Sequence, residues 1–91
     1  MALTKETIVD KIEVLEMGQV QVRTATRVKE DGAVLSTSFH RHVVEPSTKA
    51  SGSWADTDIS GEDARVQAVA NATWTDSVKT AYQEMVDANS L

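Results

Sequence analysis

Two histidines placed two residues apart are the feature of this chain that most resembles a reaction centre. His40 and His42 lie in the segment SFHRHVVEP, residues 38–46, and the chain has no other histidine. Residues two apart on a β-strand point to the same face, so both imidazoles could reach one metal ion. A catalytic zinc site needs three protein ligands and a structural one needs four. Because the sequence has neither a cysteine nor a third histidine, we expect no intrachain metal site.

Two interpretations of the histidines stay open. In the first, two copies of the chain each contribute His40 and His42 to a metal on an oligomer axis. In the second, which we favour, the histidines lie on the polar side of a strand near a protein contact.

Motifs of the common enzyme classes are absent from the sequence. It contains no G-x-S-x-G, no phosphate-binding glycine loop, no H-E-x-x-H and no C-x-x-C. The clustered carboxylates of residues 56–63 are explained by a loop and by the start of a helix. We therefore expect no enzymatic activity and no cofactor.

The charge of the chain is unevenly distributed. Residues 1–50 hold seven basic and seven acidic side chains, whereas residues 51–91 hold two basic and seven acidic ones, which accounts for the net charge of −5. The acidic second half is either a solvated helical surface or a docking face for a basic partner.

Four basic residues of the first half, Lys11, Arg23, Arg27 and Lys29, have the spacing to share the polar face of a sheet. No aromatic residue alternates with them, as stacking of single-stranded nucleic acid would need, and Glu13 is expected to neutralise part of the patch by cross-strand pairing. We therefore expect no nucleic-acid partner.

Membrane and export signals are missing as well. No segment approaches the roughly 20 apolar residues of a membrane helix, and the opening MALTKETIVDKIEV lacks the basic and apolar regions of a signal peptide. We expect a soluble protein that is made in a cytoplasm and has no membrane partner.

Alternating residues predict two β-strands in the first third of the chain. In residues 7–17, Ile8, Ile12 and Val14 share one parity, and Lys11 and Glu13 lie on the other. Residues 19–29, QVQVRTATRVK, place β-branched side chains on every even position without a break. The intervening Gly18 suits a turn with positive φ.

A hairpin and a third strand follow. Asp31-Gly32 is the dipeptide typical of a two-residue type I′ turn. Residues 33–44 then form a strand with apolar groups on both parities, and Pro46 ends it because proline cannot donate to a ladder.

The last third of the chain indicates a loop and two helices. Residues 47–59 are small and polar and predict a loop from the sheet to the helices. Ser60, with Asp63 three residues later, is expected to cap the first helix, and Thr75 the second. Trp74 is expected in the core. Acidic residues near the end of the second helix oppose its dipole, so its last turn should fray unless a cation from elsewhere meets it.

The predicted fold class is therefore α+β. A three-stranded antiparallel β-meander (1–46), a loop (47–59) and a helical pair (60–91) form a single domain, 1–91. The two short helices pack on one face of the meander, the face set by Val20, Val22 and Val28.

A chain this small and this poor in aromatic residues has a modest core, and it has no disulfide to compensate. Both outer strands of a meander have free edges, which another chain can complete. We therefore expect a homo-oligomer. Trp54, in a polar loop, either folds back over the core and packs on its own sheet, which we favour, or anchors a partner. The interface candidates are Trp54, Val34, Val44, His40 and His42.

Three segments also resemble a known group of proteins. KIEVLEMGQVQVRTATRVKEDG, SFHRHVVEP and ISGEDARVQAVANATWTDSVKTAYQ are similar to small uncharacterised proteins of tailed bacteriophages, many from marine and cyanobacterial hosts. The resemblance covers nearly the whole chain and implies a virion component. It implies location in the virion, contacts with itself and with other virion proteins, and a non-enzymatic role at the tail, the fibre-attachment region or the capsid surface. The alternative is a small phage-encoded regulator that binds a host protein through its acidic helices.

Overall fold

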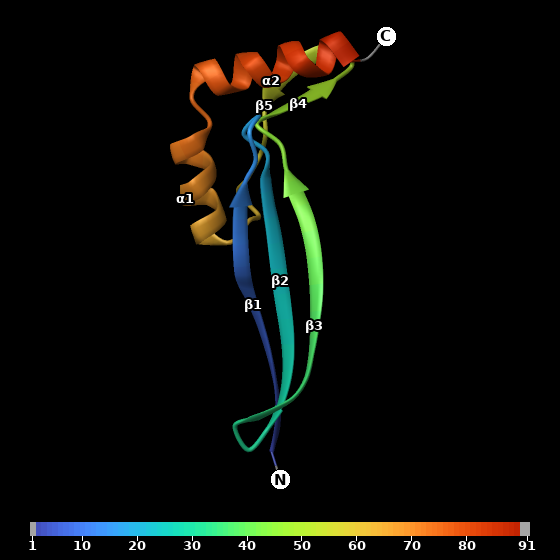
Figure 1. The fold of residues 1–91 in the computed structure, drawn as a ribbon, viewed down its shortest axis with the longest axis vertical. Coiled ribbons are helices and arrows are strands. Elements are labelled where there is room, and N and C mark those ends of the chain that lie inside the picture. The colour runs from blue at the N-terminus through green and yellow to red at the C-terminus, as the bar shows by residue number, and fades with distance from the viewer. Residues whose placement is uncertain (1, 90–91) are drawn as a thin grey trace.

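The computed structural model describes residues 2–89 as a long three-stranded sheet with two helices and a small hairpin gathered at one end (Figure 1). The first residue and the last two residues of the expected domain lie outside this range. The principal axes measure 56 × 26 × 23 Å, so the molecule is elongated along its strands. The predicted α+β class, an antiparallel meander followed by two helices, is confirmed.

The main sheet has the order β1-β2-β3, formed by β1 (Leu3–Val14), β2 (Val20–Glu30) and β3 (Ala33–Val44). β1 begins four residues before its predicted start. It also ends before residue 17, because the chain turns between Leu15 and Gly18, where the Gly18 N–H donates to the Leu15 carbonyl at 3.0 Å. Gly18 has the positive φ, 88°, expected of the turn. The second turn is also as predicted, since Asp31 and Gly32 both have positive φ.

The two faces of the sheet differ in what covers them. We call the face of Val20 and Val22, against which the helices pack, the inner face, and the face of Arg23 and Ala25 the outer face. The prediction that Ile8 shares a face with Ile12 was wrong. A β-bulge between Val9 and Lys11 inserts one residue, so Ile8 pairs with Ala25 on the outer face, whereas Ile12 pairs with Val22 on the inner face.

Residues 47–59, predicted as a loop, contain a second small sheet. β4 (Ser47–Ala50) pairs antiparallel with β5 (Ser53–Asp56) through a tight turn in which Ser51 and Gly52 both have positive φ. Serine is an unusual residue at positive φ, which is why the turn is harder to recognise than Asp31-Gly32.

The helices are α1 (Ala64–Thr73) and α2 (Asp76–Asn89). Asp63, rather than the predicted Ser60, is the N-cap of α1, and its carboxylate accepts from the Arg65 N–H at 2.8 Å. Ser60 instead donates its own N–H to Asp58 in the preceding turn. Thr75 caps α2 as predicted, with its hydroxyl oxygen accepting from the Val78 N–H at 3.3 Å. Within residues 2–89, neither helix is long and apolar enough to cross a membrane.

The core lies where α1 and the connection to α2 meet the inner face. It is a cluster of six buried residues, Val20, Val22, Val44, Val66, Ala70 and Trp74. Trp74 is in the core as predicted, and its indole nitrogen donates to the Gly18 carbonyl oxygen at 2.7 Å. Val28, predicted to be covered by the helices, lies outside this cluster, because the sheet extends well beyond them (Figure 1).

Candidate interaction surface

The two histidines lie on the inner face of β3, where their ring centroids are 6.4 Å apart. The Nε2 of His42 is 2.7 Å from Oε1 of Glu62, in the segment before α1, so this imidazole already has a partner within the chain. Within residues 2–89, no three histidine, cysteine, aspartate or glutamate side chains are arranged to hold a metal ion. A metal shared between two copies stays the less favoured of the two interpretations.

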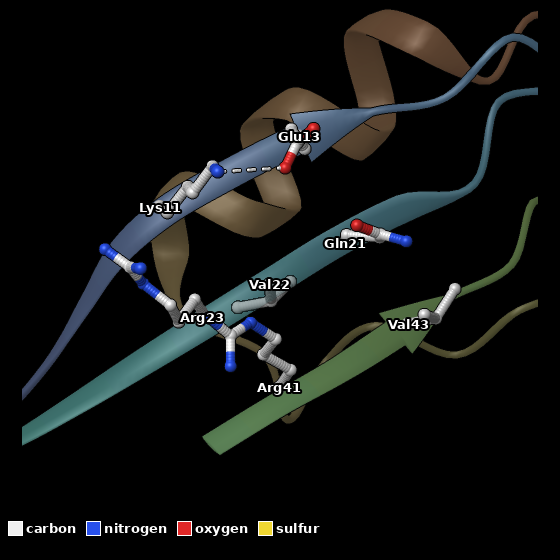
Figure 2. A pocket seen from close by; sticks show the side chains of 7 residues that line it. All are labelled: Lys11, Glu13, Gln21, Val22, Arg23, Arg41 and Val43. Atoms are coloured by element: carbon white, nitrogen blue, oxygen red, sulfur yellow. Dashed lines mark ion pairs between the residues drawn. The ribbon is translucent and has the colours of Figure 1, made fainter. Parts of the chain in front are cut away.

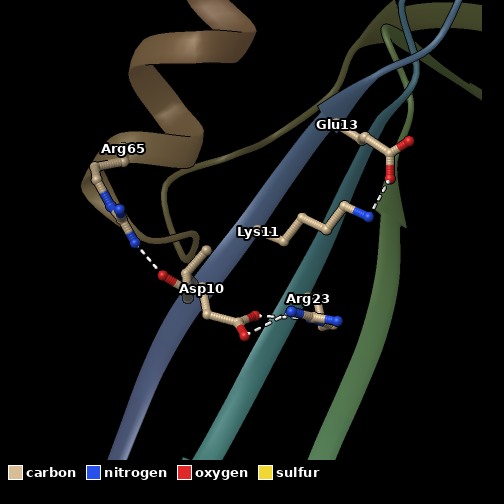
Figure 3. Close-up of polar contacts among 6 residues, drawn as sticks. Asp10, Lys11, Glu13, Arg23 and Arg65 are labelled. Atoms are coloured by element: carbon tan, nitrogen blue, oxygen red, sulfur yellow. Dashed lines mark hydrogen bonds and ion pairs between the residues drawn. The ribbon is translucent and has the colours of Figure 1, made fainter.

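The cationic outer face is largely neutralised by ion pairs across β1 and β2 (Figure 3). Arg23 donates to Asp10 through Nε and Nη2, both at 2.9 Å, and this bidentate bond lowers the pKa of Asp10 below its ordinary value. Glu6 lies 2.6 Å from Lys29 and 3.8 Å from Arg27, and the hydrogen bond from Lys29 lowers its pKa.

Glu13 behaves differently from the sequence-based expectation of cross-strand pairing. Its carboxylate lies 3.2 Å from Lys11, two residues earlier on the same strand (Figure 3). Both side chains are about half exposed, so the pair adds little to stability.

A shallow cleft opens on the outer face where the ion pairs end. Figure 2 shows it between the side chains of β1 and β3, over β2. Its volume is about 120 Å³, which suits a side chain rather than a cofactor. Arg41 faces Arg23 across the β2–β3 ladder and contributes a further positive charge to the cleft.

Exposed apolar side chains concentrate on β3. Of the seven large apolar side chains that are exposed in the structure, four are on this one strand: Val34, Leu35, Phe39 and Val43. Phe39 is 49% exposed, and the Arg23 guanidinium lies over its ring, 4.4 Å from the centroid. Ile8, Ala25 and Phe39 form one row across the outer face, and Ala25 is buried between its larger neighbours.

The two edges of the sheet are protected unequally. β1 carries five charged residues, Lys5, Glu6, Asp10, Lys11 and Glu13, and it also contains a bulge. Arg65 of α1 donates to the Val9 carbonyl (Figure 3). Charges, bulges and covering elements are the usual devices that keep an edge from pairing with another chain. β3 also has one extra residue, Leu35, at a register shift near its start, but it carries one charged residue, Arg41, so its edge is the one suited to pairing.

The predicted interface residues differ in whether the structure leaves them exposed. Val34 is 52% exposed and His40 is also exposed, so both remain available to a partner. Val44 is not available, because it is 6% exposed and belongs to the core. It points to the inner face at the end of β3, where it pairs with Val20 beneath the helices.

Trp54 folds back onto its own chain, but onto α2 rather than onto the main sheet. Its ring meets Tyr82 edge-on at 6.1 Å, and its indole nitrogen donates to Asp87 at 3.3 Å. Lys49 of β4 donates to the other oxygen of Asp87 at 2.9 Å. The sequence predicted that the acidic C-terminal end of α2 needs a positive charge from another segment, and Lys49 supplies it.

The sequence-based candidates missed three members of the β3 surface: Leu35, Phe39 and Val43. Local patterns do not reveal their face. The register set by the Asp31-Gly32 turn would, if continued, place Phe39 opposite Thr24 and Val43 opposite Val20 on the inner face. A register shift between Val28 and Lys29, where β3 has one extra residue, Leu35, instead places Phe39 opposite Ala25 and Val43 opposite Gln21 on the outer face. That face points to water within a single chain.

Comparisons with known proteins assign no function to the chain, so its interpretation rests on the surface described above. No protein-family model matches the chain, and no curated protein and no solved structure is significantly similar to it.

Proposed function

We propose that this protein is a non-enzymatic structural component of a bacteriophage particle. It acts as a small accessory piece, present in several copies, at the tail, the fibre-attachment region or the capsid surface. The observation that carries the assembly role is the edge of β3, which combines four exposed apolar side chains with a single charge. The bacteriophage setting is implied by the resemblance of the three sequence segments described above.

The shape of the chain supports an assembly role. The main sheet extends well past the helices, so both of its faces are open there in one molecule (Figure 1). Isolated sheets of this kind are marginal in water unless a hydrophobic face is covered. Contact with neighbouring proteins in a particle would cover the outer face and complete the β3 edge.

Mass spectrometry of purified particles tests the proposed function. The phage is purified through a density gradient, and peptides of this chain are quantified against those of a major capsid protein. We expect several copies per particle, in a ratio that stays constant across the particle peak. A chain that is abundant in infected cells but absent from that peak would refute the structural role.

A second candidate function, a regulator that binds a host protein, is favoured by one observation on α2. Two clefts follow its exposed side, and Ser77 and Ala81 line both of them. Glu16 borders one cleft, and Asp76 and Glu84 border the other. Met17, Val78 and Ala81 form an apolar floor in the cleft beside Glu16. An apolar floor with an acidic border suits a basic amphipathic segment. In this case Asp76→Lys and Glu84→Lys would abolish binding to a host protein, and the chain would be missing from particles.

A further inference from the structure

We propose that the β3 strands of two copies of this chain pair antiparallel about a two-fold axis at Phe39. The pairing would join two three-stranded sheets into one sheet of six strands. This inference rests on the proposed assembly role, and it names the partner of the β3 edge as a second copy of the same chain.

The choice of β3 follows from the contrast between the two edges. β1 has five charged side chains, and Arg65 donates to its Val9 carbonyl. β3 has one charged side chain in twelve residues, and three of its exposed apolar side chains, Val34, Phe39 and Val43, lie on the outer face. It also has a register shift, but this lies at its start, beside Leu35. Soluble proteins rarely leave a long apolar edge unprotected, because such an edge pairs with whatever strand it meets. A second copy is the partner that is always present at the same concentration.

The register follows from the side chains. A two-fold axis perpendicular to the sheet keeps outer faces together, so each odd residue meets an odd residue. With the axis at Phe39, the two phenyl rings face each other across the strands. Val43 of one copy then meets Val34 and Leu35 of the other. All four apolar groups of the β3 edge gain apolar neighbours in this register.

Charge repulsion favours this register over the one with its axis two residues away, at Arg41. With the axis at Phe39, Arg41 lies opposite Thr37, so no two like charges are directly opposed. An axis at Arg41 is the register that would gather His40 and His42 of both copies, but it sets two guanidiniums against each other. Like charges directly opposite on neighbouring strands are destabilising. We therefore assign the axis to Phe39 and expect no four-histidine metal site.

The size of the contact sets its strength. Eleven paired residues make an edge about 36 Å long, at roughly 3.3 Å per residue. An edge of that length and the thickness of one sheet buries on the order of 1,000 Å² in total, at the lower end of specific interfaces. The dimer is therefore expected to form with a dissociation constant on the order of micromolar.

Cysteine crosslinking tests the register, and the absence of native cysteine makes each variant a single-thiol protein. Phe39→Cys places two thiols across the axis, where paired Cα atoms lie about 4.5–5.5 Å apart and can form a disulfide. Thr37→Cys lies opposite Arg41 of the other copy, so its two thiols are too far apart. Ile8→Cys occupies the same row of the outer face on the opposite edge of the sheet. We expect rapid oxidation to a covalent dimer for Phe39→Cys alone.

Charge insertion tests the contact independently of oxidation. Phe39→Lys puts two ammonium groups at the axis, and Ile8→Lys is its matched control, since Ile8 is 40% exposed on the same face. By sedimentation equilibrium of the full chain, we expect the wild type and Ile8→Lys to dimerise, and Phe39→Lys to weaken dimerisation at least tenfold. Circular dichroism establishes that each variant is folded.

The outcomes separate this inference from the proposed function. A wild-type chain that is monomeric at 100-fold the expected micromolar dissociation constant overturns the two-fold pairing. Equal crosslinking of Phe39→Cys and Ile8→Cys overturns it too, as does a Phe39→Lys chain that still dimerises. In each case a chain found in purified particles would keep its structural role, with another virion protein at the β3 edge. A β3 dimer absent from particles would refute the structural role alone.

Discussion

The indole nitrogen of Trp74 and the carbonyl oxygen of Gly18 are joined by a hydrogen bond of 2.7 Å that ties the helices to the sheet. Gly18 lies in the turn between β1 and β2, and Trp74 lies at the C-terminal end of α1. A Cβ atom on Gly18 would lie 2.5 Å from Cγ1 of Val78 and 3.1 Å from Pro46. The close approach of this turn to α2 and to the end of β3 therefore requires glycine.

Gly18→Ala should destabilise the protein through both the backbone and the packing. Its positive φ costs about 1–2 kcal/mol for a residue with a Cβ, and the contact with Val78 adds about 1–3 kcal/mol of overpacking. Gly32→Ala is the control, since Gly32 has nearly the same φ, 87°, and open space around it. Urea unfolding should show a larger loss for Gly18→Ala. Equal losses would mean that the packing of the turn contributes nothing.

Acid should weaken the outer face of the sheet. Hydrogen bonds from Arg23 and Lys29 lower the pKa values of Asp10 and Glu6 in the folded protein. A lowered folded-state pKa gives stability that is complete above the ordinary carboxyl pKa, near 4, and is lost as the pH falls through the lowered value. The free energy of unfolding should therefore fall below about pH 4. Asp10→Asn should make this acid dependence shallower, and an unchanged slope would contradict the assignment.

High pH should lower the stability of the protein through the ionisation of Tyr82. Burial raises the pKa of Tyr82 to about 12, together with the negative Glu45 carboxylate, which accepts a hydrogen bond from the tyrosine hydroxyl. The unfolded chain loses this proton near pH 10, so stability should fall as the pH rises from about 10 to 12. The ultraviolet absorbance of tyrosinate measures the ionisation directly, because Tyr82 is the only tyrosine in the chain. An ordinary tyrosine titration in the folded protein would show that the ring is accessible to water.

Trp54→Ala distinguishes a packing role from a partner-binding role. The contact with Tyr82 and the hydrogen bond to Asp87 predict a loss of at least about 1 kcal/mol, because an aromatic pair alone contributes 0.5–1.5 kcal/mol. Thermal unfolding of the dilute protein gives the measurement. Val34→Ala, on an exposed β3 site, is the control and should cost little. If Trp54→Ala leaves the melting temperature unchanged but abolishes association, Trp54 is an anchor for a partner instead.

Local sequence patterns were sufficient to predict the main sheet and both helices. The uninterrupted alternation of residues 19–29 and the Asp31-Gly32 turn predict β2 and β3 within a residue of their ends. Thr75 predicts the start of α2. These features are local, because each depends on the chemistry of a few neighbouring residues.

The features that could not be predicted depend on contacts between distant residues. The bulge at Asp10 is visible only in the pairing of β1 with β2, yet it decides the face on which Ile8 lies. The capping residue of α1 depends on how the turn at Ser60 folds. Glu62 reaches His42 only because the segment before α1 crosses the inner face. Trp54 faces Tyr82 only once α2 lies over the β4–β5 hairpin.

Hydrogen exchange at increasing protein concentration tests most directly whether the open β3 edge is completed by another molecule. The amide protons of β3 that point away from β2 face no other strand among residues 2–89, so we expect them to exchange quickly in the dilute protein. As the concentration passes the micromolar range, we predict that these amides become protected, centred on Phe39, whereas those at the free edge of β1 do not. If β3 amides exchange at the same rate at every concentration, the edge is not completed by a second copy.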